Sequence, residues 1–137
     1  MKLNIRMLKD SDWDTLVKWW LGWKDWRVHP SKEMLPGNGT GGFMVESDGK
    51  PIVAGFLYLT NSKVAWLEWI VSDPKYKGKD RKEAIELLIN GVENVARKQG
   101  FEIILSVGRN KSLLKIHEEM GYIVDKDPSY EISKNIK

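Results

Sequence analysis

Apolar positions in the middle of the chain predict a strand, a short loop and a long helix. Seven of the eight residues at 64–71 are apolar, which is typical of a central strand covered on both faces. At about 81–99, apolar residues recur at spacings of three and four, which indicates one buried helical stripe. The stripe consists of Ala84, Leu87, Leu88, Val92, Val95 and Ala96.

Both ends of this helix carry sequence signals. Asp80 and Glu83 form a D-x-x-E pair, which predicts a capped N-terminus. Gly100 suits a left-handed cap at the C-terminus. Gly91 lies within the apolar stripe, where a bare backbone allows close contact with a sheet.

Turn signals and alternating apolar residues predict the elements before the long strand. We expect an edge strand at 3–8, a helix at 10–21, an irregular Gly- and Pro-rich loop at 28–42, and strands at 43–47 and 51–60. Asp48-Gly49 predicts a two-residue hairpin between these strands, and Gly55 marks a bulge or a close approach. The first helix would bury Trp13, Leu16, Val17, Trp20 and Leu21.

After the long helix, the pattern predicts a strand at 101–107 and a helix at 111–120. Asn110 and Gly121 suit the two caps of that helix. We then expect a strand at 122–124 and a terminal strand or tail at 130–136. The tight turns predict an antiparallel meander, and strand, helix and strand in succession predict a parallel crossover. The fold class is therefore α/β, an α+β mixed sheet of about six or seven strands with three or four helices, in a single domain over 1–137.

Composition limits the chemistry that the chain can perform. It has 137 residues, no cysteine and only two histidines. Disulfides, thiolate nucleophiles and Cys-ligated zinc are therefore excluded, and the histidines show no metal-ligand spacing. No apolar run approaches the ~18 residues of a membrane helix, and no signal-peptide pattern begins the chain. We expect a cytoplasmic protein without a metal site or a membrane partner.

Positive charge is concentrated between the long strand and the long helix. Residues 75–83 carry five cations and two anions, a net +3 that equals the formal charge of the whole chain. This basic loop is either a solvated turn or a phosphate site at a helix N-terminus. Nucleic-acid binding through lysines and exposed tryptophans is a third hypothesis, disfavoured because the patch is short and the rest of the chain is nearly neutral.

Glu68 is the one charged residue of strand 64–71. On a flat strand it shares a face with Trp66 and Ile70, and the other face carries Trp69 and Val71. A carboxylate there needs a hydrogen-bonding partner or an opening to water. It is either a structural residue at a wet strand end or a functional one, as a base or as a group that holds a water molecule.

His117 lies in the apolar stripe of helix 111–120. Asn110 precedes it by seven residues, two helical turns, so the two side chains point the same way. This histidine is either a packed structural residue or a functional one, because its helix follows the crossover strand near the end of the parallel strands.

Seven tryptophans is a high number for this length, and five of them lie between Trp13 and Trp26. Trp19, Trp23 and Trp26 fall off the first helical stripe or beyond it. They either pack under loop 28–42 or form an aromatic wall for a substrate or partner. We expect His29, in that loop, to be exposed and without a catalytic role.

Over nearly its whole length the chain resembles the GNAT N-acetyltransferase superfamily, and most closely its small, divergent, phage-type members. The most specific segments are WLEWIVSDPKYKGK at 66–79 and GRNKSLLKIHEEMGY at 108–122. The resemblance implies a sheet that splays between two parallel strands to admit acetyl-CoA. It implies that the backbone of Ile70, Val71 and Ser72 bonds the pantetheine and that Asn110 contacts the cofactor arm. The basic loop and first helical turn would hold the pyrophosphate through Lys77, Lys79, Arg81, Lys82, Glu83 and Ala84.

The basic loop departs from the family pattern Arg/Gln-x-x-Gly-x-Gly/Ala. Counted from Lys77, Asp80 and Lys82 take the small-residue positions; counted from Lys79, Lys82 and Ala84 take them. We prefer the second alignment, because it places the helix end where the family's helix ends. A glycine is missing in both, and Asp80 as N-cap would occupy the amides that a phosphate approaches, so weak or altered cofactor binding is expected.

His117 stands where the family typically has a tyrosine that protonates the leaving thiolate. Imidazole can also donate a proton. The resemblance therefore implies an acetyl-CoA-dependent N-acyltransferase that acts on a primary amine of a small molecule or peptide. Glu68 would deprotonate the amine, the backbone near Val71 would stabilise the oxyanion, and His117 would protonate the sulfur. A GNAT-shaped binding module without catalysis is the alternative. The acceptor and the oligomeric state stay open, with a homodimer as one option.

Overall fold

The computed structural model describes residues 2–24, 26 and 28–137. It groups the chain into two units, Met1–Val107 and Gly108–Lys137. The expectation of a single domain over 1–137 stays a prediction.

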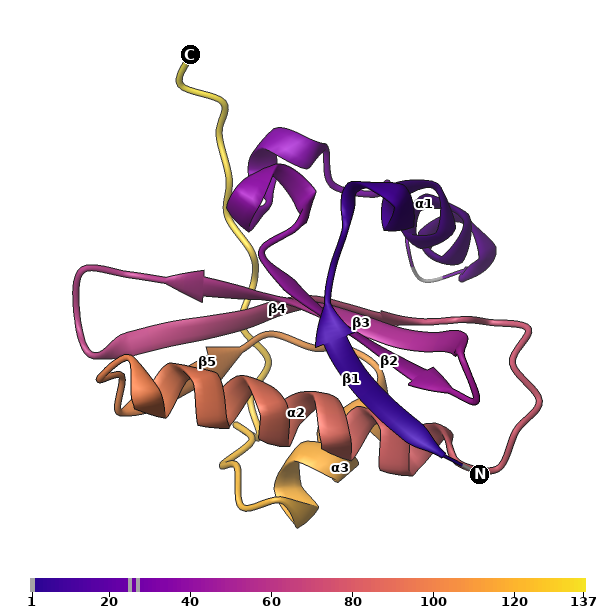
Figure 1. Cartoon of the computed structure of the whole chain (residues 1–137). Helices are drawn as coiled ribbons and strands as arrows, with labels where there is room; N and C mark the ends of the chain where they lie inside the picture. The colour runs from indigo at the N-terminus through magenta and orange to yellow at the C-terminus, as the bar shows by residue number, and fades with distance from the viewer. Residues whose placement is uncertain (1, 25, 27) are drawn as a thin grey trace. The chain divides into compact units, whose positions relative to one another are not determined.

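A five-stranded sheet forms the centre of the first unit, with its strands in sequence order from β1 at one edge to β5 at the other (Figure 1). Neighbouring strands pair antiparallel from β1 to β4, whereas β4 and β5 are parallel. The predicted meander, crossover and mixed sheet are therefore confirmed. The elements are β1 (Leu3–Met7), the 3-10 turn η1 (Asp10–Asp12), α1 (Trp13–Gly22), the 3-10 turns η2 (Lys32–Met34) and η3 (Pro36–Gly39), β2 (Gly42–Ser47), β3 (Lys50–Leu59), β4 (Val64–Ser72), α2 (Arg81–Lys98) and β5 (Ile103–Ser106).

Local turn and cap signals predicted the backbone well. Asp48 and Gly49 have φ angles of 50° and 81°, as the two central residues of a type I′ hairpin require. Gly100 follows α2 with φ 88°, which confirms the left-handed cap.

Helices α1 and α2 cover opposite faces of the sheet (Figure 1). On the α2 face, a Cβ at Gly91 would lie 2.5 Å from Cδ1 of Ile5 in β1, so the predicted close contact is confirmed. The face of α2 is centred on Leu88 and Val92, and its stripe differs slightly from the prediction because Leu87 and Val95 are only half-buried. The buried residues are Ala84, Ile85, Leu88, Ile89, Val92 and Ala96.

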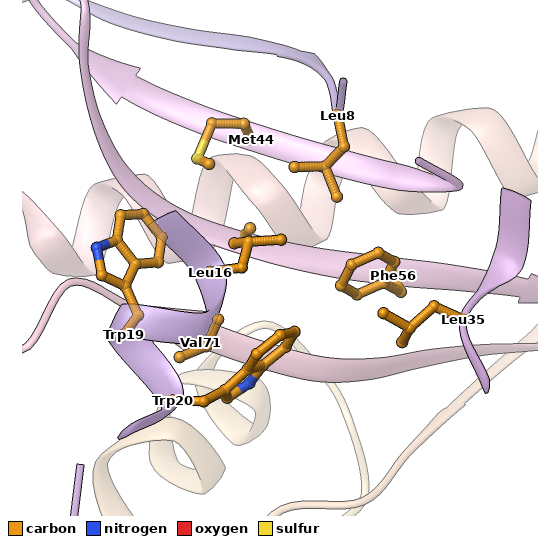
Figure 2. Close-up of a cluster of buried hydrophobic side chains, with 9 residues drawn as sticks. Leu8, Leu16, Trp19, Trp20, Leu35, Met44, Phe56 and Val71 are labelled. Carbon is orange, nitrogen blue, oxygen red and sulfur yellow. The ribbon is translucent and has the colours of Figure 1, made fainter. Parts of the chain in front are cut away.

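A cluster of buried apolar side chains fills the space between α1 and the sheet (Figure 2). Trp20 is fully buried and Trp19 is buried too, whereas Leu21 is 66% exposed. The prediction that Leu21 belongs to the buried stripe is wrong, because the face of α1 that meets the sheet runs through Leu16, Trp19 and Trp20. The cluster consists of Leu8, Leu16, Trp19, Trp20, Leu35, Met44, Ala54, Phe56 and Val71.

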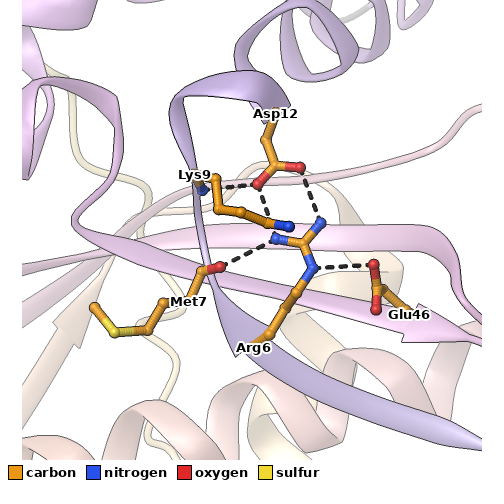
Figure 3. A network of polar contacts seen from close by, with 5 residues as sticks. All are labelled: Arg6, Met7, Lys9, Asp12 and Glu46. Atoms are coloured by element: carbon orange, nitrogen blue, oxygen red, sulfur yellow. Dashed lines mark hydrogen bonds and ion pairs between the residues drawn. The ribbon is translucent and has the colours of Figure 1, made fainter.

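Arg6 ties β1 to the start of the first helical segment and to β2 (Figure 3). Its two terminal nitrogens donate to the two carboxylate oxygens of Asp12 at 2.9 Å, and its Nε donates to Glu46 at 3.0 Å. The hydrogen bonds from Arg6 hold the pKa of Asp12 below its usual range. Bidentate pairing of this kind combines charge with fixed geometry.

The second unit contains one helix, α3 (Lys111–Glu119). The side chain of Asn110 accepts a 3.0 Å hydrogen bond from the amide of Leu113, and Gly121 has φ 96°, so both predicted caps are confirmed. The predicted strand at 122–124 is wrong: these residues are irregular and Ile123 is 96% exposed. A strand forms only where a neighbouring strand pairs with its backbone. Residues 130–136 form no strand either and are a tail, which was one of the two predicted options. The described sheet thus has five strands instead of six or seven, with three α-helices as expected.

Candidate functional site

The end of β4 is irregular where it passes Gly55 of β3. The register pairs Phe56 with Glu68 but Ala54 with Val71. Two residues of β4 therefore face Gly55 alone, which makes a β-bulge. The predicted irregularity at Gly55 is confirmed, although the extra residue belongs to β4.

The bulge changes which side chains of β4 share a face. Trp69 has φ 58°, which is rare for a bulky residue. Glu68 and Val71 both pair with residues of the α1 face, and Trp69 packs against the cluster on that face. Ile70 lies on the α2 face, where it would be 3.3 Å from a Cβ on Gly55. The predicted division, with Ile70 beside Glu68 and with Trp69 and Val71 opposite, is therefore wrong, because a bulge shifts the alternation.

Pairing between β4 and β5 ends before β4 does. The last pair joins Leu67 to Ser106, and the Ser106 hydroxyl donates a 2.6 Å hydrogen bond to the Leu67 carbonyl. β4 continues to Ser72, so residues 68–72 lie beyond the last strand pair on that side. A strand edge of this kind presents backbone donors and acceptors.

Glu68 lies beside Tyr58 on the α1 face of this segment. Burial raises the pKa of the Tyr58 hydroxyl, and the negative charge of Glu68 raises it further. Because Glu68 is half-buried, its carboxylate acts in a setting that is less polar than water, which strengthens its attraction for a cation.

An aromatic cluster, made of Trp13, Trp20, Trp26, Trp69, His29 and Phe56, covers the same face. Trp20 is its centre: the rings of the other five lie 6.0–6.5 Å from it by centroid, and Trp26 and Trp69 stack at 5.6 Å. His29 is half-buried and stacked on Trp20, so the expectation that it is exposed is wrong. Trp19 packs in the core and Trp23 and Trp26 pack against it, as the packing interpretation predicted.

The basic loop after β4 exposes Lys77, Lys79 and Lys82 to solvent, and Glu83 is exposed as well. Arg81 differs from them. One of its terminal nitrogens donates to the carbonyls of Asp73 at 2.8 Å and of Tyr76 at 2.9 Å. Its guanidinium therefore links the start of α2 to the backbone of the preceding loop.

Asp80 takes the N-cap position of α2, but its side chain makes no capping hydrogen bond. Its carboxylate accepts hydrogen bonds from the hydroxyls of Tyr76 and Ser47 instead. The predicted capping pair with Glu83 is wrong, because two hydroxyl donors have taken the carboxylate. The hydrogen bond from Tyr76 is the main cause that lowers the pKa of Asp80.

In the second unit, His117 is buried and its ring meets that of Tyr122 edge-on at 5.0 Å. Nδ1 of His117 lies 2.9 Å from the carbonyl oxygen of Leu113. Since a carbonyl only accepts, this contact assigns a proton to Nδ1. Nε2 is buried and has no hydrogen-bond partner among the described residues.

The structure thus brings one group of predicted residues together on a continuous segment. Glu68, Ile70, Val71 and Ser72 form the end of β4, and residues 77–84 follow as loop and helix. Asn110 and His117 belong to the second unit. The sequence analysis missed Tyr58 and Ser47, whose partners are distant in the chain, and Tyr76, whose hydroxyl bonds Asp80 only four residues away.

Two further classes of site find no support in the described residues. Among residues 2–24, 26 and 28–137, no group of three His, Asp or Glu side chains could hold a metal ion. No helix in the same part of the chain is both long enough and apolar enough to cross a membrane.

Comparison with known proteins finds no matching family model and no matching curated protein. Among solved structures, 154 chains match. An acetyltransferase from Trypanosoma brucei is similar with a TM-score of 0.64 and 15% identity, over 96% of this chain and 100% of that one. A ribosomal-protein alanine N-acetyltransferase from Escherichia coli is similar with a TM-score of 0.66 and 16% identity, over 88% of this chain and 77% of that one.

An aminoglycoside N-acetyltransferase in complex with CoA gives a TM-score of 0.63 and 19% identity, over 98% of this chain and 96% of that one. Taken together, these likenesses show that the chain has the fold of the GNAT acetyltransferases.

Proposed function

We propose that the protein is an N-acyltransferase that uses acetyl-CoA as acyl donor and a primary amine as acceptor. The end of β4 supports this most: it runs past the last pair with β5, carries Glu68, and leads directly into the basic loop and α2. Structural neighbours were crystallised with CoA or with a bisubstrate CoA analogue.

The cofactor would lie along the β4 edge. The pantetheine arm contains two amides, which can pair with the backbone of Ile70, Val71 and Ser72 as an added strand would. The carbonyl of Ser72 already accepts a 2.7 Å hydrogen bond from Trp23. This bond fixes the C-terminal end of β4, along which the pantetheine arm would lie. The family resemblance assigns a contact with the cofactor arm to Asn110, which belongs to the second unit.

The pyrophosphate would bind where the basic loop meets α2. Lys77, Lys79 and Lys82 supply positive charge, and the backbone of the first turn, from Arg81 through Glu83 to Ala84, supplies the positive end of the helix dipole. Arg81, whose guanidinium bonds loop carbonyls, would shape the loop while adding charge.

The acceptor amine would reach Glu68 from the side of the aromatic cluster. An ammonium ion must lose a proton before its nitrogen can attack, and Glu68 would take that proton directly or through water. The nitrogen then forms a bond to the thioester carbonyl carbon and releases its second proton to solvent water, and the C–S bond breaks. The amide of Val71 would stabilise the negative oxygen of the intermediate.

His117 would deliver a proton to the departing sulfur. With Nδ1–H bound to the Leu113 carbonyl, the neutral ring offers only an acceptor at Nε2. His117 must therefore carry both protons to act as the acid, and Nε2–H would then be the donor. This differs from a tyrosine, whose neutral hydroxyl already carries the proton.

Titration calorimetry with acetyl-CoA, followed by an assay for free CoA thiol with a panel of primary amines, tests the proposal. We expect saturable binding and amine-dependent thiol release. The variant Lys77→Ala/Lys79→Ala should bind acetyl-CoA more weakly, and Lys126→Ala/Lys134→Ala, which removes two exposed lysines near the C-terminus, is the control for loss of charge. Absence of both heat and a thermal shift at millimolar acetyl-CoA would end the proposal.

A further inference from the structure

Asp80 is a buried carboxylate in an unusual place. It is only 4% exposed and directly precedes α2. An aspartate at that position usually accepts hydrogen bonds from amides of the first helical turn. Here it makes no such bond, and the helical ladder begins with the 2.9 Å bond from the Ala84 amide to the Asp80 carbonyl.

Two hydroxyl groups from different segments hold this carboxylate. Ser47, at the end of β2, donates to Oδ2 at 2.9 Å. Tyr76, within the basic loop, donates to Oδ1. Hydrogen bonds to an ionised carboxylate are roughly twice as strong as neutral ones, whether the donor is a hydroxyl or an amide, so two hydroxyl donors can replace the helix amides.

Gly78 in the basic loop leaves room for the hydrogen bond between Tyr76 and Asp80. A Cβ at Gly78 would collide with the ring and hydroxyl of Tyr76. Gly78 therefore provides the space in which the tyrosine ring lies. Arg81 also donates a hydrogen bond to the carbonyl of Tyr76, which fixes the backbone of the same residue.

We propose that Ser47 and Tyr76 are positioning residues that keep the Asp80 carboxylate off the first turn of α2 and so leave that turn open to the pyrophosphate of acyl-CoA. The inference rests on the proposed function. A carboxylate bonded to those amides would occupy the anion site and repel the phosphates. With the carboxylate held elsewhere, the loop can accept a phosphate although it lacks the usual glycine.

Removing the two hydroxyls tests this arrangement. In Ser47→Ala/Tyr76→Phe, the Asp80 carboxylate loses both donors and is free to bond the helix amides. We expect the Kd for CoA, measured by titration calorimetry, to rise about tenfold. Tyr130→Phe, which removes an exposed hydroxyl in the tail, is the matched control and should bind CoA as the wild type does.

A third substitution separates this role from simple anchoring of the loop. Adding Asp80→Ala to the double variant removes the carboxylate that would compete with phosphate. We expect CoA binding to recover to within about twofold of wild type. Anchoring alone predicts the opposite, because the triple variant has lost every member of the anchor. Should the double variant fail to fold, Tyr76→Phe with and without Asp80→Ala gives the same comparison with a smaller change.

The outcomes are distinct. Recovery by Asp80→Ala supports the inference. Unchanged CoA binding in the double variant, or a loss that Asp80→Ala does not restore, overturns it and leaves the proposed function standing. A wild-type protein that does not bind CoA overturns the proposed function and this inference together.

Discussion

The indole Nε1 of Trp69 donates a 3.0 Å hydrogen bond to the hydroxyl of Tyr58. The same hydroxyl donates a 2.8 Å bond to the carbonyl of Met34 in η2. Trp69 is also the residue with φ 58° in the β4 bulge. The side chains of Trp69 and Tyr58 and the backbone of Met34 therefore hold the irregularity that places Glu68 and Val71 on one face of the sheet.

Removing the Tyr58 hydroxyl should loosen the bulge. In Tyr58→Phe the indole N–H and the Met34 carbonyl each lose their partner, so we expect the free energy of unfolding to fall by about 1 kcal/mol. Urea denaturation followed by tryptophan fluorescence measures this. Tyr130→Phe should change stability by less than about 0.5 kcal/mol, and equal stability of the two variants would contradict the prediction.

Glu68 should matter for turnover more than for cofactor binding. Glu68→Gln keeps the shape of the side chain but removes the base, so we expect kcat to fall about 100-fold. The Kd for CoA should stay within about twofold of wild type, because the proposed pyrophosphate site is formed by other residues. A variant with wild-type kcat would show that Glu68 is only structural.

His117 should be replaceable by another proton donor but not by an apolar ring. We expect His117→Phe to lower kcat about 100-fold and His117→Tyr to retain most of it, because a phenol can also protonate the leaving sulfur. Circular dichroism of both variants checks that α3 is intact. Full transferase activity in His117→Phe would show that His117 is not the acid. If the wild-type protein shows no transferase activity and His117→Phe leaves its ligand binding unchanged, the protein is a binding module.

Acid should remove the contribution of the Arg6–Asp12 pair. The pKa of Asp12 is lowered by hydrogen bonds from Arg6, so the folded state favours the ionised carboxylate. The stabilisation is complete above the ordinary Asp value of about 3.9 and is lost as the pH falls through the lowered folded value. We expect Asp12→Asn to cost roughly 1–2 kcal/mol at pH 7, with less difference from wild type below about pH 4. Urea denaturation of both proteins at pH 7 and at several values below about pH 4 tests this, and a difference that stays the same over that whole range would contradict it.

Local patterns in the sequence were enough to predict most of the backbone. The hairpin at Asp48-Gly49, the caps at Gly100 and Asn110, and the buried face of α2 all follow from preferences that act within a few residues. The crossover from β4 through α2 to β5 follows as well, because strand–helix–strand connections have one favoured hand. The GNAT fold was predicted on this basis together with the quoted motifs, and it is confirmed.

The sequence by itself therefore determined the order and type of the elements and the residues 64–84 as the centre of the candidate site. Only the tertiary structure decided which way the side chains of that site point. The bulge opposite Gly55 moved Val71 to the face of Glu68, and Ser47, 33 residues away in the chain, drew the Asp80 carboxylate from the helix terminus where its position alone would place it. The physical reason is competition: a carboxylate or a strand residue takes the better of several partners, and the better partner exists only after distant segments have come together.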